Sequence, residues 1–264
     1  TVARKLILRK TTLGSAGGAF GYALTNTVQT TGTVTTSVAG TPTTIDGDTA
    51  STATQAYTIT SPTTAVTINE NTLPAGWQLT GASCINASGA TVGSLSGSTY
   101  TITGAEIAAS TSFTCTYTNT RLARLVVTKL AIGGGATFPF AVTGGLTPAS
   151  FNLNPNPPST PSVSQVFTNV PVGTNIVVTE NTPSTPNWVL VAINCVDATG
   201  APAGSTVATN ITNGPTTLGT STLNLVPGAD ITCTFVNTRN VDIAIVKLAQ
   251  GGDTTVNYTI TNSG

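Results

Sequence analysis

Three polar residue types with complementary chemistry recur at matched positions in two halves of the chain. The matched sets are Lys10, Glu70 and Asn119, followed by Lys129, Glu180 and Asn237. The whole chain holds only four lysines and three glutamates, so this repetition uses most of them. A neutral amine can attack the carboxamide of asparagine while a nearby carboxylic acid polarises the carbonyl and carries protons. The product would be a Lys–Asn isopeptide bond, with ammonia released.

Strand alternation explains how these groups could become reactive. Side chains of a strand point alternately to its two faces, and Lys10 shares its face with Leu6 and Leu8. The glutamate and the asparagine of each set likewise lie at the end of a strand segment, on the same face as its alternating apolar residues. Desolvation lowers the pKa of lysine and raises that of glutamate, which produces a nucleophile beside a proton donor. The alternative is an unreactive buried Lys–Glu pair with the asparagine hydrogen-bonded beside it.

The segments that carry these residues belong to a long internal repeat. The segment before Lys10 recurs before Lys129 and again before Lys247, and each full unit closes on a Cys-Thr-aromatic-x-Asn-Thr-Arg motif. We therefore divide the chain into repeats at 1–121 and 122–240. Residues 241–264 would begin a third repeat or donate a strand to a neighbouring molecule.

The composition of the repeats predicts an all-β fold. The segments are short, rich in threonine and β-branched residues, alternating, and separated by Gly, Pro and Asn clusters, and no window shows a helical period. Units of this length fit tandem antiparallel Ig-like β-sandwiches better than closed barrels, although the pattern alone does not exclude a barrel.

One pair of cysteines falls in each repeat. This distribution predicts disulfides between Cys84 and Cys115 and between Cys195 and Cys233, and hence an oxidising, extracellular compartment. Two reduced core pairs are the alternative. A four-cysteine zinc site is disfavoured because no Cys-x-x-Cys spacing occurs.

The composition excludes several classes of function. The chain has no histidine, which removes the usual general base and the commonest metal ligand, so we expect no metal and no cofactor. With a formal net charge of +0 it has no basic excess for nucleic acid. No apolar run approaches the length of a membrane span, and the first residues do not form a leader, so we expect a mature or excised piece of a protein.

The motifs together resemble a known family. A lysine in the first strand, a Glu-x-x-x-Pro-x-Gly-aromatic segment from Glu70 to Trp77, and a last strand ending in Asn-Thr are similar to Cna-B-type or SpaA-type (prealbumin-like) domains of bacterial surface adhesins and pilins. The resemblance covers residues 1–240, and the second repeat departs from it in the turn before Trp188. It implies prealbumin-like sandwiches in which Lys10–Asn119 and Lys129–Asn237 form isopeptide bonds assisted by Glu70 and Glu180. The C-terminal end resembles the start of a surface-protein repeat domain.

These features predict a structural protein of the bacterial cell surface. We expect a stalk or pilus-like fibre whose partners are other copies or neighbouring surface-protein domains, and no turnover enzyme. The alternative is an adhesin that recognises a carbohydrate or host protein through loops near 26–56 or 145–165.

Overall fold

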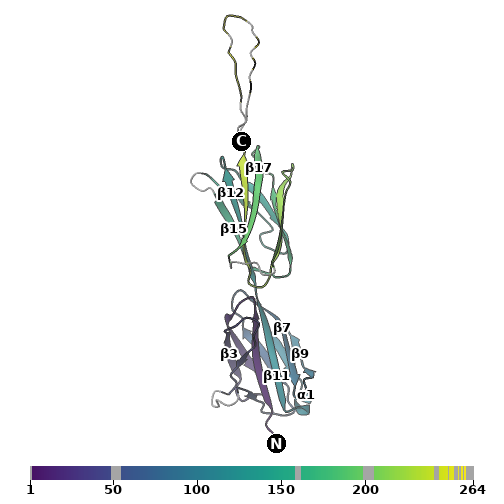
Figure 1. Ribbon diagram of the computed structural model, residues 1–264. Helices are drawn as coiled ribbons and strands as arrows, with labels where there is room; N and C mark the ends of the chain where they lie inside the picture. Colours follow the sequence, from purple (N-terminus) through teal and green to yellow (C-terminus); the bar gives the residue numbers. More distant parts are fainter. Residues whose placement is uncertain are drawn as a thin grey trace.

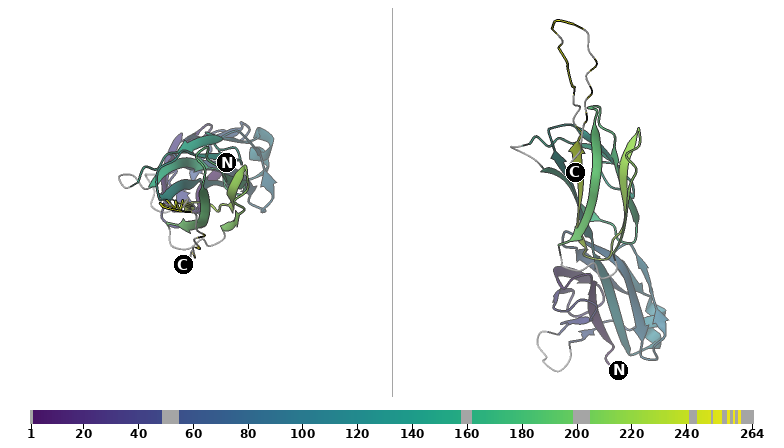
Figure 2. Two further views of the ribbon diagram at one scale, coloured as in Figure 1. Left: turned by 90° about the horizontal axis from the view of Figure 1, so that it is seen from above. Right: turned by 45° about the horizontal axis from the view of Figure 1, so that its top comes forward.

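The computed structural model describes residues 2–48, 55–157, 162–198, 205–240, 244–248 and 250–252, together with 255, 257 and 259. These residues form two β-sandwiches joined end to end (Figure 1). Viewed from above, the second sandwich lies over the first (Figure 2). The prediction of tandem all-β sandwiches is confirmed.

The first sandwich consists of two facing sheets. One has the order β4-β1-β11-β7-β8, with β5 also paired to β1, and the other has the order β3-β2-β6-β10-β9. The elements are β1 (Lys5–Leu13), β2 (Gly17–Leu24), β3 (Thr31–Thr36), β4 (Thr43–Ile45), β5 (Tyr57–Thr58), β6 (Val66–Thr72), β7 (Trp77–Asn86), β8 (Thr91–Val92), β9 (Ser94–Ser96), β10 (Thr99–Ile102), α1 (Gly104–Ala109) and β11 (Ser112–Arg121).

The second sandwich repeats this plan. Its sheets have the orders β15-β12-β20-β17 and β14-β13-β16-β19-β18. The strands are β12 (Ala123–Ile132), β13 (Phe138–Val142), β14 (Ser150–Leu153), β15 (Ser162–Val170), β16 (Asn175–Asn181), β17 (Trp188–Asp197), β18 (Thr206–Ile211), β19 (Thr217–Asn224) and β20 (Asp230–Arg239).

One strand pair in each sandwich departs from the antiparallel expectation. β1 pairs with β11 in parallel, and β12 pairs with β20 in parallel. A parallel pair needs a long connection, and here the rest of the sandwich supplies it. The first and last strands of each sandwich therefore lie side by side and point the same way.

Alternating burial gives each sandwich its own hydrophobic core. In β1 every second side chain from Leu6 to Thr12 is buried. The buried apolar residues form two separate clusters, one between the sheets of each sandwich. Because the clusters are separate, each sandwich carries the packing that it needs to hold its own site.

The short helix α1 was not predicted from periodicity. It is six residues long and buries a single side chain, Ile107, so no apolar period can develop. Its signal is a capping box, in which the Thr103 side chain accepts from the amide of Glu106 while the Glu106 side chain accepts from the amide of Thr103. No helix in the described part of the chain is long and apolar enough to span a bilayer.

The third repeat or donated strand predicted at residues 241–264 falls largely outside the described residues, and Val241 and Ile243 are not among them. Residues 244–248 are described and form no strand. Within them, Ile245 and Leu248 are exposed.

Candidate cross-link sites

Three strands of the first sandwich bring Lys10, Glu70 and Asn119 together. Lys10 lies on β1 and Asn119 on the neighbouring β11, in the same sheet. Glu70 lies on β6 in the facing sheet. All three side chains point into the space between the sheets and are buried.

Each sandwich has a β-bulge in the strand that pairs with its asparagine. In the pairing of β11 with β7, Thr118 faces Gly81 and Asn119 faces Leu79, so Thr80 is the extra residue. The second sandwich has its extra residue, Val191, at the corresponding place beside Asn237. The bulge bends the strand that carries the extra residue, and each asparagine keeps the inward alternation of its own strand.

The glutamate of the first site bridges the two residues that would react. The Lys10 Nζ donates to the Glu70 Oε1 over 2.5 Å. The Asn119 Nδ2 donates to the other carboxylate oxygen, Oε2, over 3.0 Å. The Lys10 Nζ also donates to the Asn119 Oδ1, so the amine lies directly against the carboxamide.

Burial makes Lys10 easier to deprotonate than an exposed lysine. Burial lowers the pKa of Lys10 from 10.5 to about 8, although the hydrogen bond and charge of Glu70 oppose the shift. The Phe20 ring centroid lies 4.1 Å from the Nζ, a cation–π contact that also opposes the shift because it stabilises the ammonium form. An amine with this pKa loses its proton far more easily than an exposed lysine does, which makes it a better nucleophile.

The second sandwich gathers Lys129, Glu180 and Asn237 in a different arrangement. These side chains are fully buried and come from β12, β16 and β20. The Lys129 Nζ donates to the Asn237 Oδ1 over 2.8 Å and to the carbonyls of Leu130 and Phe235 over 2.8 and 3.0 Å. Its distance to the Glu180 Oε1 is 3.8 Å.

Glu180 is held less firmly than Glu70. Among the described residues, neither of its carboxylate oxygens has a hydrogen-bond partner, and the same is true of the Asn237 Nδ2. Burial raises the pKa of Glu180 and lowers that of Lys129, because both charged forms are desolvated. Burial therefore weakens the preference of both groups for their charged forms.

Each sandwich also holds a disulfide close to its polar cluster. Cys84 on β7 is bonded to Cys115 on β11, and Cys195 on β17 to Cys233 on β20. In both cases the two cysteines are direct partners across neighbouring strands. The last strand of each sandwich thus carries both the cysteine and the asparagine, four residues apart.

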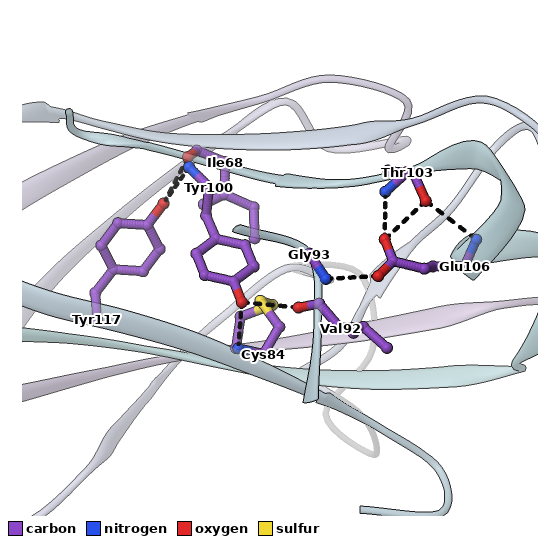
Figure 3. The surroundings of a disulfide bond; sticks show 9 residues. Ile68, Cys84, Val92, Gly93, Tyr100, Thr103, Glu106 and Tyr117 are labelled. Atoms are coloured by element: carbon purple, nitrogen blue, oxygen red, sulfur yellow. Dashed lines mark hydrogen bonds between the residues drawn. A yellow bond between two sulfur atoms is a disulfide. The ribbon is translucent and has the colours of Figure 1, made fainter. Parts of the chain in front are cut away.

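Buried tyrosines line the first disulfide. The Tyr100 hydroxyl donates to the carbonyl of Val92 over 2.7 Å and accepts from the amide of Cys84 over 3.2 Å (Figure 3). The Tyr117 hydroxyl donates to the carbonyl of Ile68 over 2.5 Å. These bonds tie the disulfide-bearing sheet to the facing one.

One residue of the first site was not predicted. The Tyr22 hydroxyl donates to the Glu70 Oε1 over 2.9 Å. Tyr22 lies on β2, directly opposite Glu70 in the strand pairing. Phe20, Tyr22 and Leu24 alternate along β2 and are all buried, but the pairing of Tyr22 with Glu70 is set by the register of β2 against β6, which the sequence does not show.

Comparisons with solved structures find distant likenesses. A mutant of the major pilin from Streptococcus pyogenes is 13% identical, with 89% of this chain and 99% of that chain covered and a TM-score of 0.28. An adhesin from Mobiluncus mulieris containing intramolecular disulfide, isopeptide and ester bond cross-links is 9% identical, with 87% and 86% covered and a TM-score of 0.33. The pilus adhesin SpaC from Lactobacillus rhamnosus GG is 14% identical, with 93% and 32% covered and a TM-score of 0.28.

A family comparison is more direct. No curated protein is similar enough to match the chain. A family model described as a prealbumin-like fold domain matches residues 6–121 and again residues 125–239. These ranges cover both sandwiches and both Lys–Glu–Asn clusters, so the chain belongs to the family of prealbumin-like fold domains and carries two of them in tandem.

Proposed function

We propose that this chain is a load-bearing part of a stalk or fibre on the bacterial cell surface. In this proposal each sandwich, at 1–121 and 122–240, is locked by its disulfide and by an isopeptide bond, Lys10–Asn119 or Lys129–Asn237. The observation that carries it is the direct contact of the buried Lys10 amine with the Asn119 carboxamide, with Glu70 hydrogen-bonded to both. The partners would be other copies or neighbouring surface-protein domains.

The reaction balances without a cofactor. Lys10 passes its extra proton to Glu70, and the neutral Nζ attacks the Asn119 Cγ. As the Nζ–Cγ bond forms, Glu70 exchanges the proton lost by the amine for one delivered to the Nδ2. The Cγ–Nδ2 bond then breaks and ammonia leaves. Each site would react once, so this is self-modification and not turnover.

The placement of the cross-link suits a protein under tension. The chain enters the first sandwich at the Lys5 end of β1 and leaves at the Arg121 end of the adjacent, parallel β11. A bond between Lys10 and Asn119 would pass force directly from the first strand to the last. Residues 11–118 would then stay folded while the chain is pulled.

Intact-mass measurement with and without reduction tests the proposal. We expect a mass short by one ammonia per sandwich, in addition to the hydrogens lost from the two disulfides. Glu70→Ala and Glu180→Ala should each restore one ammonia. Glu106→Ala is the matched control, since Glu106 caps α1 and its variant should keep both bonds. A wild-type mass explained by the disulfides alone would overturn the isopeptide proposal.

Binding measurements separate a stalk from a ligand-binding adhesin. A stalk protein should show no binding to glycan arrays or to matrix-protein arrays. Binding that is lost on mutation of the loops near 26–56 or 145–165 would instead favour the adhesin.

The same proposal gives residues 241–264 a joining role, as the start of a further repeat or as a donated strand. Truncation after residue 240 tests the donated strand. Assembly that persists in the shortened chain would rule it out.

A further inference from the structure

The two clusters differ at one residue that faces the glutamate. Tyr22 is paired with Glu70 across β2 and β6, and Phe140 is paired with Glu180 across β13 and β16. The rings are equivalent in their packing as well. Tyr22 makes an edge contact with Tyr117 at 5.2 Å, and Phe140 makes one with Phe235 at 5.2 Å. The first sandwich therefore has a hydroxyl where the second has none.

We propose that Tyr22 is a positioning residue for cross-linking, and that its replacement by Phe140 makes the second sandwich cross-link more slowly than the first. This inference rests on the proposed isopeptide function. It assigns to Tyr22 no contact with the reacting atoms, and its effect passes through Glu70.

The Tyr22 hydroxyl fixes the direction of the carboxylate. Tyr22 is buried, and its desolvation together with the charge of Glu70 raises its pKa far above the usual value, so the hydroxyl keeps its proton. It therefore acts as a donor to the Glu70 Oε1, the same oxygen that accepts from Lys10. This arrangement leaves Oε2 facing the Asn119 Nδ2 at 3.0 Å.

A carboxylate held in this way can relay a proton between the two nitrogens. One oxygen lies where Lys10 releases a proton, and the other lies where the leaving ammonia must receive one. General acid–base catalysis requires this hydrogen-bond reach at both ends of the transfer. Tyr22 stabilises the orientation in which both contacts exist together.

The second cluster shows the arrangement without that donor. Neither oxygen of Glu180 has a hydrogen-bond partner among the described residues, and the Lys129 Nζ lies 3.8 Å from the nearer one. Lys129 donates instead to two backbone carbonyls and to Asn237. The amine touches the carboxamide, but the acid is not aligned to relay its proton.

Exchanging the two aromatic residues tests the inference. The full chain is made by cell-free synthesis, quenched in denaturant at successive times, and digested. Mass spectrometry then follows the Lys10–Asn119 and Lys129–Asn237 cross-linked peptides separately. The variants are Tyr22→Phe, Phe140→Tyr and the double exchange. Tyr100→Phe is the control, because it also removes a buried, hydrogen-bonded hydroxyl from the first core.

We expect the first bond of the wild-type chain to form before the second. Loss of a hydrogen bond to a charged group should slow the first bond in Tyr22→Phe by about ten- to a hundred-fold. Phe140→Tyr should accelerate the second, and the double exchange should reverse the order. A merely structural effect of Tyr22 would not produce that reversal.

The outcomes distinguish this inference from the function on which it rests. If both bonds form in the wild type and Tyr22→Phe is no slower than Tyr100→Phe, Tyr22 has no positioning role and the proposed function stands. If Tyr22→Phe fails to fold, an unchanged second bond in Phe140→Tyr overturns the inference. If no cross-linked peptide forms in the wild type, the proposed function and this inference both fail.

Discussion

The carbonyl of Arg121 accepts a hydrogen bond from the amide of Gly228 over 3.0 Å. Arg121 ends β11 and Gly228 lies in the loop before β20, so the bond joins the first sandwich to the second. The two sandwiches are separated by the single residue Leu122, whose amide donates to the carbonyl of Gly76 over 2.9 Å. The linker is one residue long, and these hydrogen bonds tie the chain around it to both sandwiches. Little bending is therefore expected at the junction.

Gly14→Val should loosen this junction. Gly14 has φ +85°, and an added Cβ would lie 2.5 Å from the Pro227 carbonyl carbon and oxygen. The substituted residue and the loop of the second sandwich must therefore move apart. We expect a broader distribution of end-to-end distances in small-angle X-ray scattering, with both sandwiches still folded.

Gly40→Val is the matched control for that experiment. Gly40 also has a positive φ, of +76°, but an added Cβ would meet no described atom within 4 Å. Both variants carry the backbone strain of about 1–2 kcal/mol that a side chain brings to this region. A scattering profile equally altered in Gly40→Val would show that the close approach of Gly14 is not what holds the junction straight.

Lys10 should make the stability of an uncross-linked first sandwich depend on pH. The variant Asn119→Ala cannot form the bond and keeps the buried lysine. Burial lowers the Lys10 pKa from 10.5 to about 8, so between these values the unfolded chain binds more protons than the folded one. Stability should then rise as the pH rises through this window, by at most roughly 3 kcal/mol.

Urea unfolding in a Trp188→Phe background measures this effect, because Trp77 fluorescence then reports on the first sandwich. The comparison is Asn119→Ala with and without Lys10→Met. Only the chain that retains Lys10 should gain stability between pH 8 and 10.5. Parallel pH profiles of the two chains would contradict the assignment.

Arg4 should stabilise the carboxyl end of α1. Its Nε donates to the carbonyls of Ile107 and Ser110 over 2.8 and 3.1 Å, and its Nη2 donates to the carbonyl of Ala108 over 3.0 Å. A cation near the last turn satisfies free carbonyls and interacts favourably with the helix dipole. Arg4→Ala should lower the free energy of unfolding by about 1–2 kcal/mol.

Arg124→Ala serves as the comparison for Arg4. Arg124 pairs with Asp230 over 2.8 Å, but the two side chains are 44% and 32% exposed, so the pair should contribute only about 0–1 kcal/mol. Equal losses in the two variants, measured by urea unfolding, would argue against a specific capping role for Arg4.

The alternation of each strand made it possible to predict which polar residues face the core. The contacts between those residues could not be predicted in this way. The two-residue period places Lys10 beside Leu6 and Leu8 on one face, and the structure buries all three. The contact with Asn119 depends on the parallel pairing of β1 with β11, strands that are more than a hundred residues apart in the sequence. Tyr22 was missed for the same reason, since its partner Glu70 is defined by strand register across a sheet.

The two disulfides should differ in their resistance to reduction. Cys84 and Cys115 are fully buried, whereas Cys195 is half-buried with its Sγ 3.3 Å from the Ser221 Oγ. Thiol–disulfide exchange requires the attacking thiolate to reach a sulfur atom, so access controls its rate. A mild reductant under native conditions should therefore open Cys195–Cys233 before Cys84–Cys115.

Alkylation after short exposure to the reductant, followed by peptide mapping, gives the order of opening. Each disulfide closes a loop, of 31 and 38 residues, that should contribute roughly 4 kcal/mol in the chain-entropy model. The stability lost on removal should thus be similar for Cys84→Ser/Cys115→Ser and Cys195→Ser/Cys233→Ser. If the two double variants lose equal stability while the two disulfides are reduced at different rates, the rates are set by access of the reductant to the sulfur atoms and not by the stability that each disulfide contributes. Reduction of Cys84–Cys115 first would show that local opening of the first sandwich, and not the static exposure of Cys195, sets the order.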